Sequence, residues 1–304
     1  MRKRYISLLQ AALGLFLCMG AAKAQVVVSS KIDTEGSILG TMIIDVLNAH
    51  GIPTVNKLQL GGTPIVRKAL LAGQIDIYPE YTGNAAYFFH KTDEPIWSDP
   101  SKAYNEAKTL DMAVNHIVWL TPAPADNSWA IALRKDVSQP HHIVTFSDFA
   151  RYLNNGGKIK LAASAEFVNS PAALPAFEKA YGFTLKPRQL LILSGGDTMA
   201  TITAAARNTN DVNAAMVYTT DGGIAASGLV VLADDKHVEP VYQPAPIIRA
   251  AVLARYPAIA DLLKPVFLSL TTPVLQDLNG KVEVGGEAVQ AVVGAYLHSK
   301  GFLK

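Results

Sequence analysis

Two short segments carry residue types that are able to do chemistry. His141-His142 is a histidine pair, and Gly195-Gly196-Asp197-Thr198 is a glycine-rich turn before a predicted helix. Adjacent side chains diverge from the backbone and no carboxylate lies at ligand spacing, which favours an exposed turn over a metal site for the histidines. The glycine-rich run resembles a phosphate loop only loosely and is better explained as a turn that caps a helix. Neither segment predicts a reaction.

The signatures of common enzyme classes are missing from the sequence. It contains no GxGxxG fingerprint, no Walker A loop, no HExxH pair and no GxSxG elbow, and its carboxylates form no pair at a defined spacing. We therefore expect a protein that binds a ligand and is not an enzyme, with no metal and no cofactor.

Aromatic residues recur where predicted strands end. Tyr78 and Tyr81 flank a Pro-Glu pair, Trp129 follows a proline-rich stretch, Tyr218 ends a strand, and Tyr242 lies in a Val-Tyr-Gln-Pro run. A single tyrosine or tryptophan more often belongs to the core, because its ring buries well with one polar partner. The shared location of these aromatics predicts instead that they meet at one cleft.

The elements that must position these residues form two similar series of alternating strands and helices. In the first, strands at 26–28, 57–60 and 75–78 enclose helices at 38–47 and 63–73, the second opened by Thr63-Pro64. In the second, strands at 161–162, 190–193 and 214–218 enclose helices opened by Ser170-Pro171 and by Asp197-Thr198. Helical patterns at 259–270 and 287–297 follow. This order predicts an α/β fold with two lobes.

Two crossings divide the chain. The proline-rich stretch 119–127 cannot continue a helix and connects the lobes, and a second crossing follows Tyr218. The predicted division is 25–124 for lobe I, 125–222 for lobe II and 223–304 for the return to lobe I, each lobe being a mixed, mainly parallel sheet flanked by helices. Open α/β sheets bind ligands at the carboxyl ends of their strands, so we expect a small ligand between the lobes.

Residues 1–24 have the form of a secretory signal peptide. A basic start is followed by an apolar run at 6–19, shorter than the ~20 residues of a membrane span, and by Ala22-Lys23-Ala24. We expect cleavage before Gln25 and a soluble periplasmic protein. The segment contains Cys18, the single cysteine, so the mature chain has no disulfide and no thiolate ligand.

The net charge of the mature chain is slightly negative. The whole sequence has 27 basic and 25 acidic residues, and the segment 1–24 holds four of the basic ones and none of the acidic ones. Cleavage therefore leaves 23 basic residues and 25 acidic ones, a net charge of −2, which does not suit a nucleic-acid binder.

Five segments resemble the periplasmic substrate-binding proteins of osmoprotectant ABC importers, the receptors for glycine betaine, choline and carnitine. They are Val28-Ser29-Ser30-Lys31 with Asp33-Thr34-Glu35, Leu60-Gly61-Gly62-Thr63, the run from Ile75 to Gly83 with its Tyr-Pro-Glu-Tyr-Thr-Gly, Asn127 to Ala132, and Tyr218 to Gly222. The segments 161–167 and 173–183 are similar to the YehZ-like branch, whose members bind betaine weakly. The resemblance implies a type II clamshell, a monomer, and delivery to permease subunits driven by a cytoplasmic ATPase.

The resemblance also implies a site. A trimethylammonium group has no N–H to donate, so aromatic faces must hold it. The implied cage is Tyr81, Trp129, Tyr218 and Tyr242, and the implied donors to the ligand's carboxylate are Lys31 and Asn84. Secondary candidates are Tyr78, Gly36, Ser170 and Thr63.

Three departures from the family pattern predict weak binding of glycine betaine. Gly36 stands where relatives commonly have Gln, Ser170 where they have Arg, and Asn84 where they have Thr. Asn84 still donates, whereas the other two remove long donors, and losing a charge-assisted hydrogen bond of ~1.5–3 kcal/mol weakens binding roughly ten- to a hundredfold. Two alternatives stay open: a clamshell for another ligand, such as an opine or a basic amino acid, or for a sensor, and a secreted enzyme on this scaffold.

Overall fold

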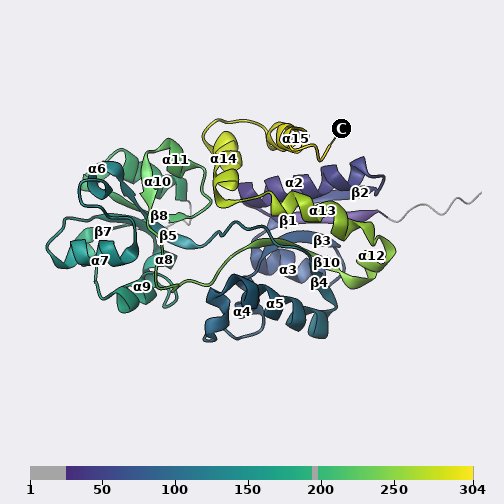
Figure 1. The fold of residues 1–304 in the computed structure, drawn as a ribbon, viewed down its shortest axis with the longest axis horizontal. Coiled ribbons are helices and arrows are strands. Elements are labelled where there is room, and N and C mark those ends of the chain that lie inside the picture. Colours follow the sequence, from purple (N-terminus) through teal and green to yellow (C-terminus); the bar gives the residue numbers. More distant parts are fainter. Residues whose placement is uncertain (1–24, 194–197, 304) are drawn as a thin grey trace, which may run out of the picture.

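The computed structural model in Figure 1 describes residues 25–193 and 198–303. Two lobes lie side by side, and each is a five-stranded sheet with helices on both faces. The α/β fold with two lobes is therefore as the sequence predicts. The predicted signal peptide at 1–24 lies outside the described residues, as do positions 195–197 of the glycine-rich turn.

Lobe I contains the sheet with strand order β2-β1-β3-β10-β4. Its strands are β1 (Val26–Lys31), β2 (Thr54–Gly61), β3 (Ile77–Tyr81), β4 (Ile117–Trp119) and β10 (Pro244–Arg249). One face packs against α2 (Thr34–Ala49), α12 (Ala250–Arg255), α13 (Ala258–Leu268), α14 (Thr272–Glu283) and α15 (Val289–Ser299). The other face packs against α3 (Thr63–Leu71), α4 (Asn84–Phe88), the short 3₁₀ helix η1 (Pro95–Ser98) and α5 (Pro100–Asn115).

Alternation along the central strands separates these two cores. Ile77 and Ile248 belong to the core under α2, whereas their neighbours Tyr78 and Ile247 belong to the core under α3 and α5. Successive side chains of a strand point to opposite faces, so one strand supplies both cores. This is why the strands read as continuous apolar runs in the sequence.

Lobe II contains the sheet with strand order β7-β6-β8-β5-β9. Its strands are β5 (Trp129–Arg134), β6 (Leu161–Ser164), β7 (Leu190–Leu193), β8 (Ala214–Tyr218) and β9 (Leu229–Val231). The helices are α6 (Lys135–Ser138), α7 (Phe146–Asn154), α8 (Ala165–Asn169) and α9 (Leu174–Tyr181) on one face, and α10 (Thr198–Ala206) and α11 (Gly223–Ala226) on the other, with 3₁₀ turns η2 (Pro187–Gln189) and η3 (Thr209–Asp211).

Each sheet is mixed, with its parallel pairs on one side. β1 pairs in parallel with β2 and β3, and β6 with β7 and β8. The strand that enters each sheet from the other lobe, β5 or β10, pairs antiparallel with both of its neighbours. Half of the pairings are therefore antiparallel, more than a mainly parallel sheet would have.

The structure corrects one predicted boundary. The chain was expected to return to lobe I at residue 223, but β9 pairs with β5 in the lobe II sheet. The second crossing is the segment 232–243, which leads into β10. A three-residue strand is too short to show a hydrophobic period, which explains the error.

One predicted helix start also differs. Ser170 does not open a helix but ends α8, and the next helix begins at Leu174. The helix predicted to open at Thr63-Pro64 does begin there, as α3, and Gly62 is its N-cap.

Besides the two chain crossings, helix α14 connects the lobes by contacting both of them. It packs on α2 of lobe I and on α11 of lobe II. Gln276 Nε2 donates to Thr219 O at 2.7 Å, and a Cβ atom on Gly222 would lie 2.0 Å from the backbone N of Gly280, so only glycine fits at position 222.

Among the described residues no single helix is long and apolar enough to cross a membrane. Helices α13 and α14 meet the length and composition test only when they are taken together, and they are bent by 87° relative to each other.

Candidate ligand-binding site

A cavity of about 690 Å³ lies between the lobes. Its size is that of a small-molecule pocket. Eight of the ten predicted site residues line it: Lys31, Thr63, Tyr81, Asn84, Trp129, Ser170, Tyr218 and Tyr242. The carboxyl ends of β1, β3 and β8 all reach this wall, which is where an open α/β sheet presents ligand sites.

Strand register brings the aromatic residues together. Trp129, the first residue of β5, lies directly opposite Tyr218, the last residue of β8. Their ring centroids are 6.1 Å apart with 24° between the planes. In lobe I, Tyr81 ends β3 opposite Pro244, and Tyr242 lies two residues before that pair. Lobe II therefore contributes two rings from one antiparallel pair of strands, whereas Tyr81 comes from β3 and Tyr242 from the segment that leads into β10.

The ring of Tyr242 needs a glycine beside it. A Cβ atom on Gly83 would lie 2.8 Å from the Tyr242 ring, closer than side chains normally approach. The glycine of the Tyr-Thr-Gly run therefore lets the ring lie against the backbone.

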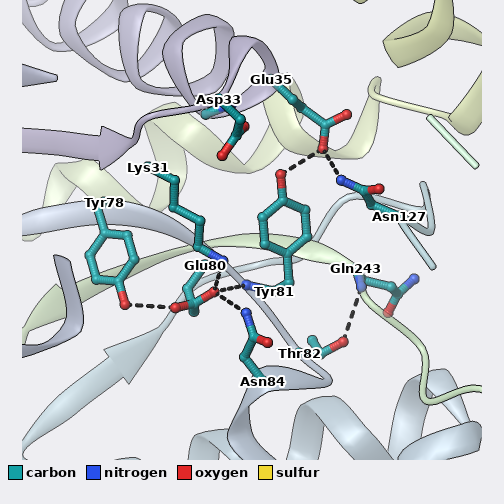
Figure 2. A network of polar contacts seen from close by, with 11 residues as sticks. Lys31, Asp33, Glu35, Tyr78, Glu80, Tyr81, Thr82, Asn84, Asn127 and Gln243 are labelled. Atoms are coloured by element: carbon teal, nitrogen blue, oxygen red, sulfur yellow. Dashed lines mark hydrogen bonds and ion pairs between the residues drawn. The ribbon is translucent and has the colours of Figure 1, made fainter. Parts of the chain in front are cut away.

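A buried carboxylate fixes the phenol of Tyr81, as Figure 2 shows. The Tyr81 hydroxyl donates to Glu35 Oε1 at 2.6 Å, and Asn127 Nδ2 donates to the same oxygen at 3.0 Å. Asn279 Nδ2 of α14 donates to Glu35 Oε2 and to Thr220 O, both at 2.9 Å. Burial raises the pKa of Glu35, and hydrogen bonds from Thr220, Tyr81 and Asn279 oppose the rise. The network ties α2 in lobe I to α14 and lobe II directly behind the cage.

Glu80 engages both side chains that were expected to bind a ligand carboxylate. Lys31 Nζ lies 2.6 Å from Glu80 Oε1 and 4.4 Å from the centroid of the Tyr81 ring. Asn84 Nδ2 donates to Glu80 Oε1 at 2.7 Å, and the Tyr78 hydroxyl donates to Oε2 at 2.7 Å (Figure 2). Lys31 and Asn84 therefore line the cavity with their donors already directed to a carboxylate of the protein itself.

Two secondary candidates do not line the cavity. Tyr78 is fully buried and lies on the opposite face of β3 from Tyr81, because the two positions differ by an odd number. Gly36 lies inside the first turn of α2, where its N–H caps onto Asp33 Oδ1 at 2.6 Å. A Cβ atom there would lie 3.0 Å from Lys31 O, so a longer side chain such as Gln would have no room without a shift of the turn.

The wall of the cavity is acidic. Five carboxylates line it, Asp33, Glu35, Glu166, Asp221 and Glu283, whereas Lys31 is the one basic side chain among the described lining residues. Burial raises the pKa of Asp221 to about 7, against a hydrogen bond from Tyr218 N at 2.8 Å. Such a wall favours a cation.

Sequence reasoning did not assign a role to these acidic residues. Asp33, Glu35 and Asp221 stand inside the segments that resembled the family, so a signal was present. Asn279 and Glu283 come from a helix far along the chain, and no local pattern points to them.

The histidine pair takes no part in the cavity. His141 and His142 are exposed in a turn after α6, as expected. The described residues contain no group of three or more His, Cys, Asp or Glu that could hold a metal ion.

Two α/β lobes with one aromatic and acidic cavity between them define the class of two-lobed ligand-binding proteins, as the sequence indicates. The family model OpuAC, described as the substrate binding domain of the ABC-type glycine betaine transport system, matches residues 24–299, and the chain belongs to this family.

Individual proteins with similar sequences and structures belong to the same class of glycine betaine-binding proteins. The chain is 52% identical to the glycine betaine-binding protein YehZ of Escherichia coli over 283 residues, 93% of each chain. It is 30% identical to a glycine-betaine-binding protein of Pseudomonas aeruginosa, over 98% of this chain and 94% of that one. The solved structure of apo YehZ superposes with a TM-score of 0.83, covering 92% of this chain and 99% of the other. The predicted resemblance to the YehZ-like branch and the type II clamshell are confirmed.

Proposed function

We propose that this protein captures a quaternary-ammonium solute, such as glycine betaine or choline, in the periplasm and delivers it to an ABC importer. The observation that carries the proposal is the meeting of Tyr81, Trp129, Tyr218 and Tyr242 in one acidic cavity. A quaternary ammonium has no N–H group, so it gains most from ring faces and from negative potential, and each ring contributes ~0.5–2 kcal/mol. The names of the relatives from E. coli and P. aeruginosa support the same ligand class.

The ion pair between Lys31 and Glu80 affects which of these solutes the cavity prefers. A ligand carboxylate must compete with Glu80 for the Lys31 ammonium, and Ser170 offers only a short hydroxyl from the other lobe. Choline carries no carboxylate and makes no such demand. We therefore infer weak binding of glycine betaine, and binding of choline at least as tight.

The mechanism is capture by closure. Two crossings, 120–128 and 232–243, connect the lobes, and a few hinge residues in such segments absorb the rotation that closes a clamshell. Closure brings the Trp129–Tyr218 pair of lobe II onto the Tyr81–Tyr242 pair of lobe I, with the ligand between them. The closed form then docks on the permease subunits. The protein acts as a monomer and catalyses no reaction.

Calorimetric titration tests this function. The purified protein, residues 25–304, is unfolded and refolded to remove carried-over ligand, then titrated with glycine betaine, choline, proline betaine, carnitine and arginine. We expect saturable binding of at least one quaternary amine and none of arginine. Heat from arginine alone would contradict the proposal and favour a receptor for basic amino acids.

The pH dependence of binding provides a second test. Asp221 has a pKa of about 7, because burial disfavours its charged form. A cation in the same cavity favours the carboxylate, so the affinity for choline should rise a few-fold as the pH increases through 7. The Asp221→Asn variant should lose this rise. Titrations at one pH unit on either side of the pKa measure it, and an equal rise in the variant would assign the effect to another group.

A further inference from the structure

A second cavity, of about 390 Å³, lies at the hinge. Trp129 belongs to its wall and to the wall of the ligand cavity. The rest comes from both crossings, from Ala130, Thr219 and Val231 of lobe II, and from Thr272 and Gln276 of α14. The hinge cavity is thus built largely by the segments that connect the lobes, and the proposed function makes no use of it.

The hinge cavity contains a buried carboxyl group without a partner. Glu239, in the second crossing, is 6% exposed, and its Oε1 atom has no hydrogen-bond partner among the described residues. Burial, with Asp234 and Asp126 nearby, raises its pKa to about 9. A buried carboxyl group that accepts no hydrogen bond is costly, and in native proteins such a group calls for an explanation.

Several donors close to Glu239 are already engaged elsewhere. Ser128 Oγ donates to Asp126 Oδ1 at 2.7 Å, and Gln276 Nε2 donates to Thr219 O at 2.7 Å. The backbone N–H groups of Val238 and Glu239 both donate to Asp234 Oδ2, at 2.6 and 3.0 Å. Asp126 and Asp234 are therefore satisfied by the protein, whereas the carboxyl group of Glu239 is left for a donor from outside.

We propose that the hinge cavity is a second binding site, for a small primary ammonium ion whose N–H groups donate to Glu239. A primary ammonium supplies three donors and a positive charge, which match an unpartnered carboxylate beside Asp126 and Asp234. Val231 and Leu232 line the same cavity and suit a short apolar body. A quaternary ammonium has no N–H group and leaves Glu239 unsatisfied, so the two cavities select different cations.

Binding at this site is linked to a proton. The free carboxyl group holds its proton at pH 7, whereas the ammonium-bound form favours the carboxylate. Binding should therefore release about one proton, and the affinity should rise about tenfold per pH unit between 7 and the pKa of about 9. The other titratable side chains that line the hinge cavity are Asp126, Asp234 and His237.

The test is calorimetric titration of the protein with propylammonium chloride, in two buffers of different ionisation enthalpy. We expect saturable binding at millimolar concentration with proton release at pH 7. Glu239→Gln should weaken binding at least about tenfold and abolish the release, because the charged acceptor is gone. Glu287→Gln removes one negative charge at an exposed position and should change neither.

Three results would each overturn the proposal. They are the absence of binding to the wild-type protein, undiminished binding to Glu239→Gln, and displacement of propylammonium by tetramethylammonium, which would place the ligand in the aromatic cavity. The first and third are measured on the wild-type protein, so they hold even if the variant does not fold. Because tetramethylammonium is also titrated alone, failure of this proposal and failure of the proposed function are distinguishable.

Discussion

Replacing Tyr218 by alanine should lower the affinity for choline by roughly thirtyfold, which corresponds to about 2 kcal/mol for a desolvated cation–π contact. Tyr218 ends β8 and stacks beside Trp129, at 6.1 Å between centroids, so its loss removes one face of the cage and frees the other ring to move. Burial raises the pKa of Tyr218 to about 12, so the ring stays neutral and its contribution should not vary near pH 7. Calorimetric titration of the variant with choline measures the loss.

Tyr218→Phe is the matched control for this prediction. It keeps the ring and removes only the hydroxyl, so it should bind choline within a few-fold of the wild-type protein. Equal affinity of Tyr218→Ala and the wild-type protein would show that the cage is not the binding element. A loss as large in Tyr218→Phe as in Tyr218→Ala would assign the energy to the hydroxyl and not to the ring.

The strands that carry the aromatic residues could be predicted from the sequence because each is a short apolar run with an aromatic residue at its end. β3 and β8 were both expected within a few residues of their observed ends. Trp129 and Tyr218 were assigned to one cleft on the strength of that position and the family resemblance. What the sequence does not contain is the register that sets these two residues opposite each other, since pairing between strands depends on the whole sheet.

The polar half of the site was less predictable, for a physical reason. Lys31 was expected to bind the ligand because its type and position suit a carboxylate, and the structure pairs it with a carboxylate 49 positions further along the chain, Glu80. Likewise, Asn279 reaches Glu35 from 244 positions away. The first contact joins neighbouring strands of one sheet and the second joins a returning helix to α2, and no periodicity or spacing along the sequence reports either of them.

The Lys31–Glu80 pair makes the second strong prediction. Glu80 is fully buried and accepts from Lys31, Tyr78, Asn84 and the backbone N–H of Tyr81. Removing one partner of a buried ion pair leaves the other charge uncompensated, so Glu80→Gln should reduce the free energy of unfolding by about 3–5 kcal/mol. Chemical denaturation monitored by tryptophan fluorescence measures this loss.

The same substitution should change which ligand is preferred. In Glu80→Gln the Lys31 ammonium loses its carboxylate at 2.6 Å and becomes available to the carboxylate of glycine betaine. A new charge-assisted hydrogen bond of ~1.5–3 kcal/mol would raise the ratio of betaine to choline affinity by roughly ten- to a hundredfold. Adding Lys31→Met to Glu80→Gln should cancel the gain and leave choline binding in place, because the new partner is gone while the rings remain. If the ratio stays constant across all three proteins, Lys31 does not face the ligand, and the carboxylate end of the site must be sought among the residues of lobe II.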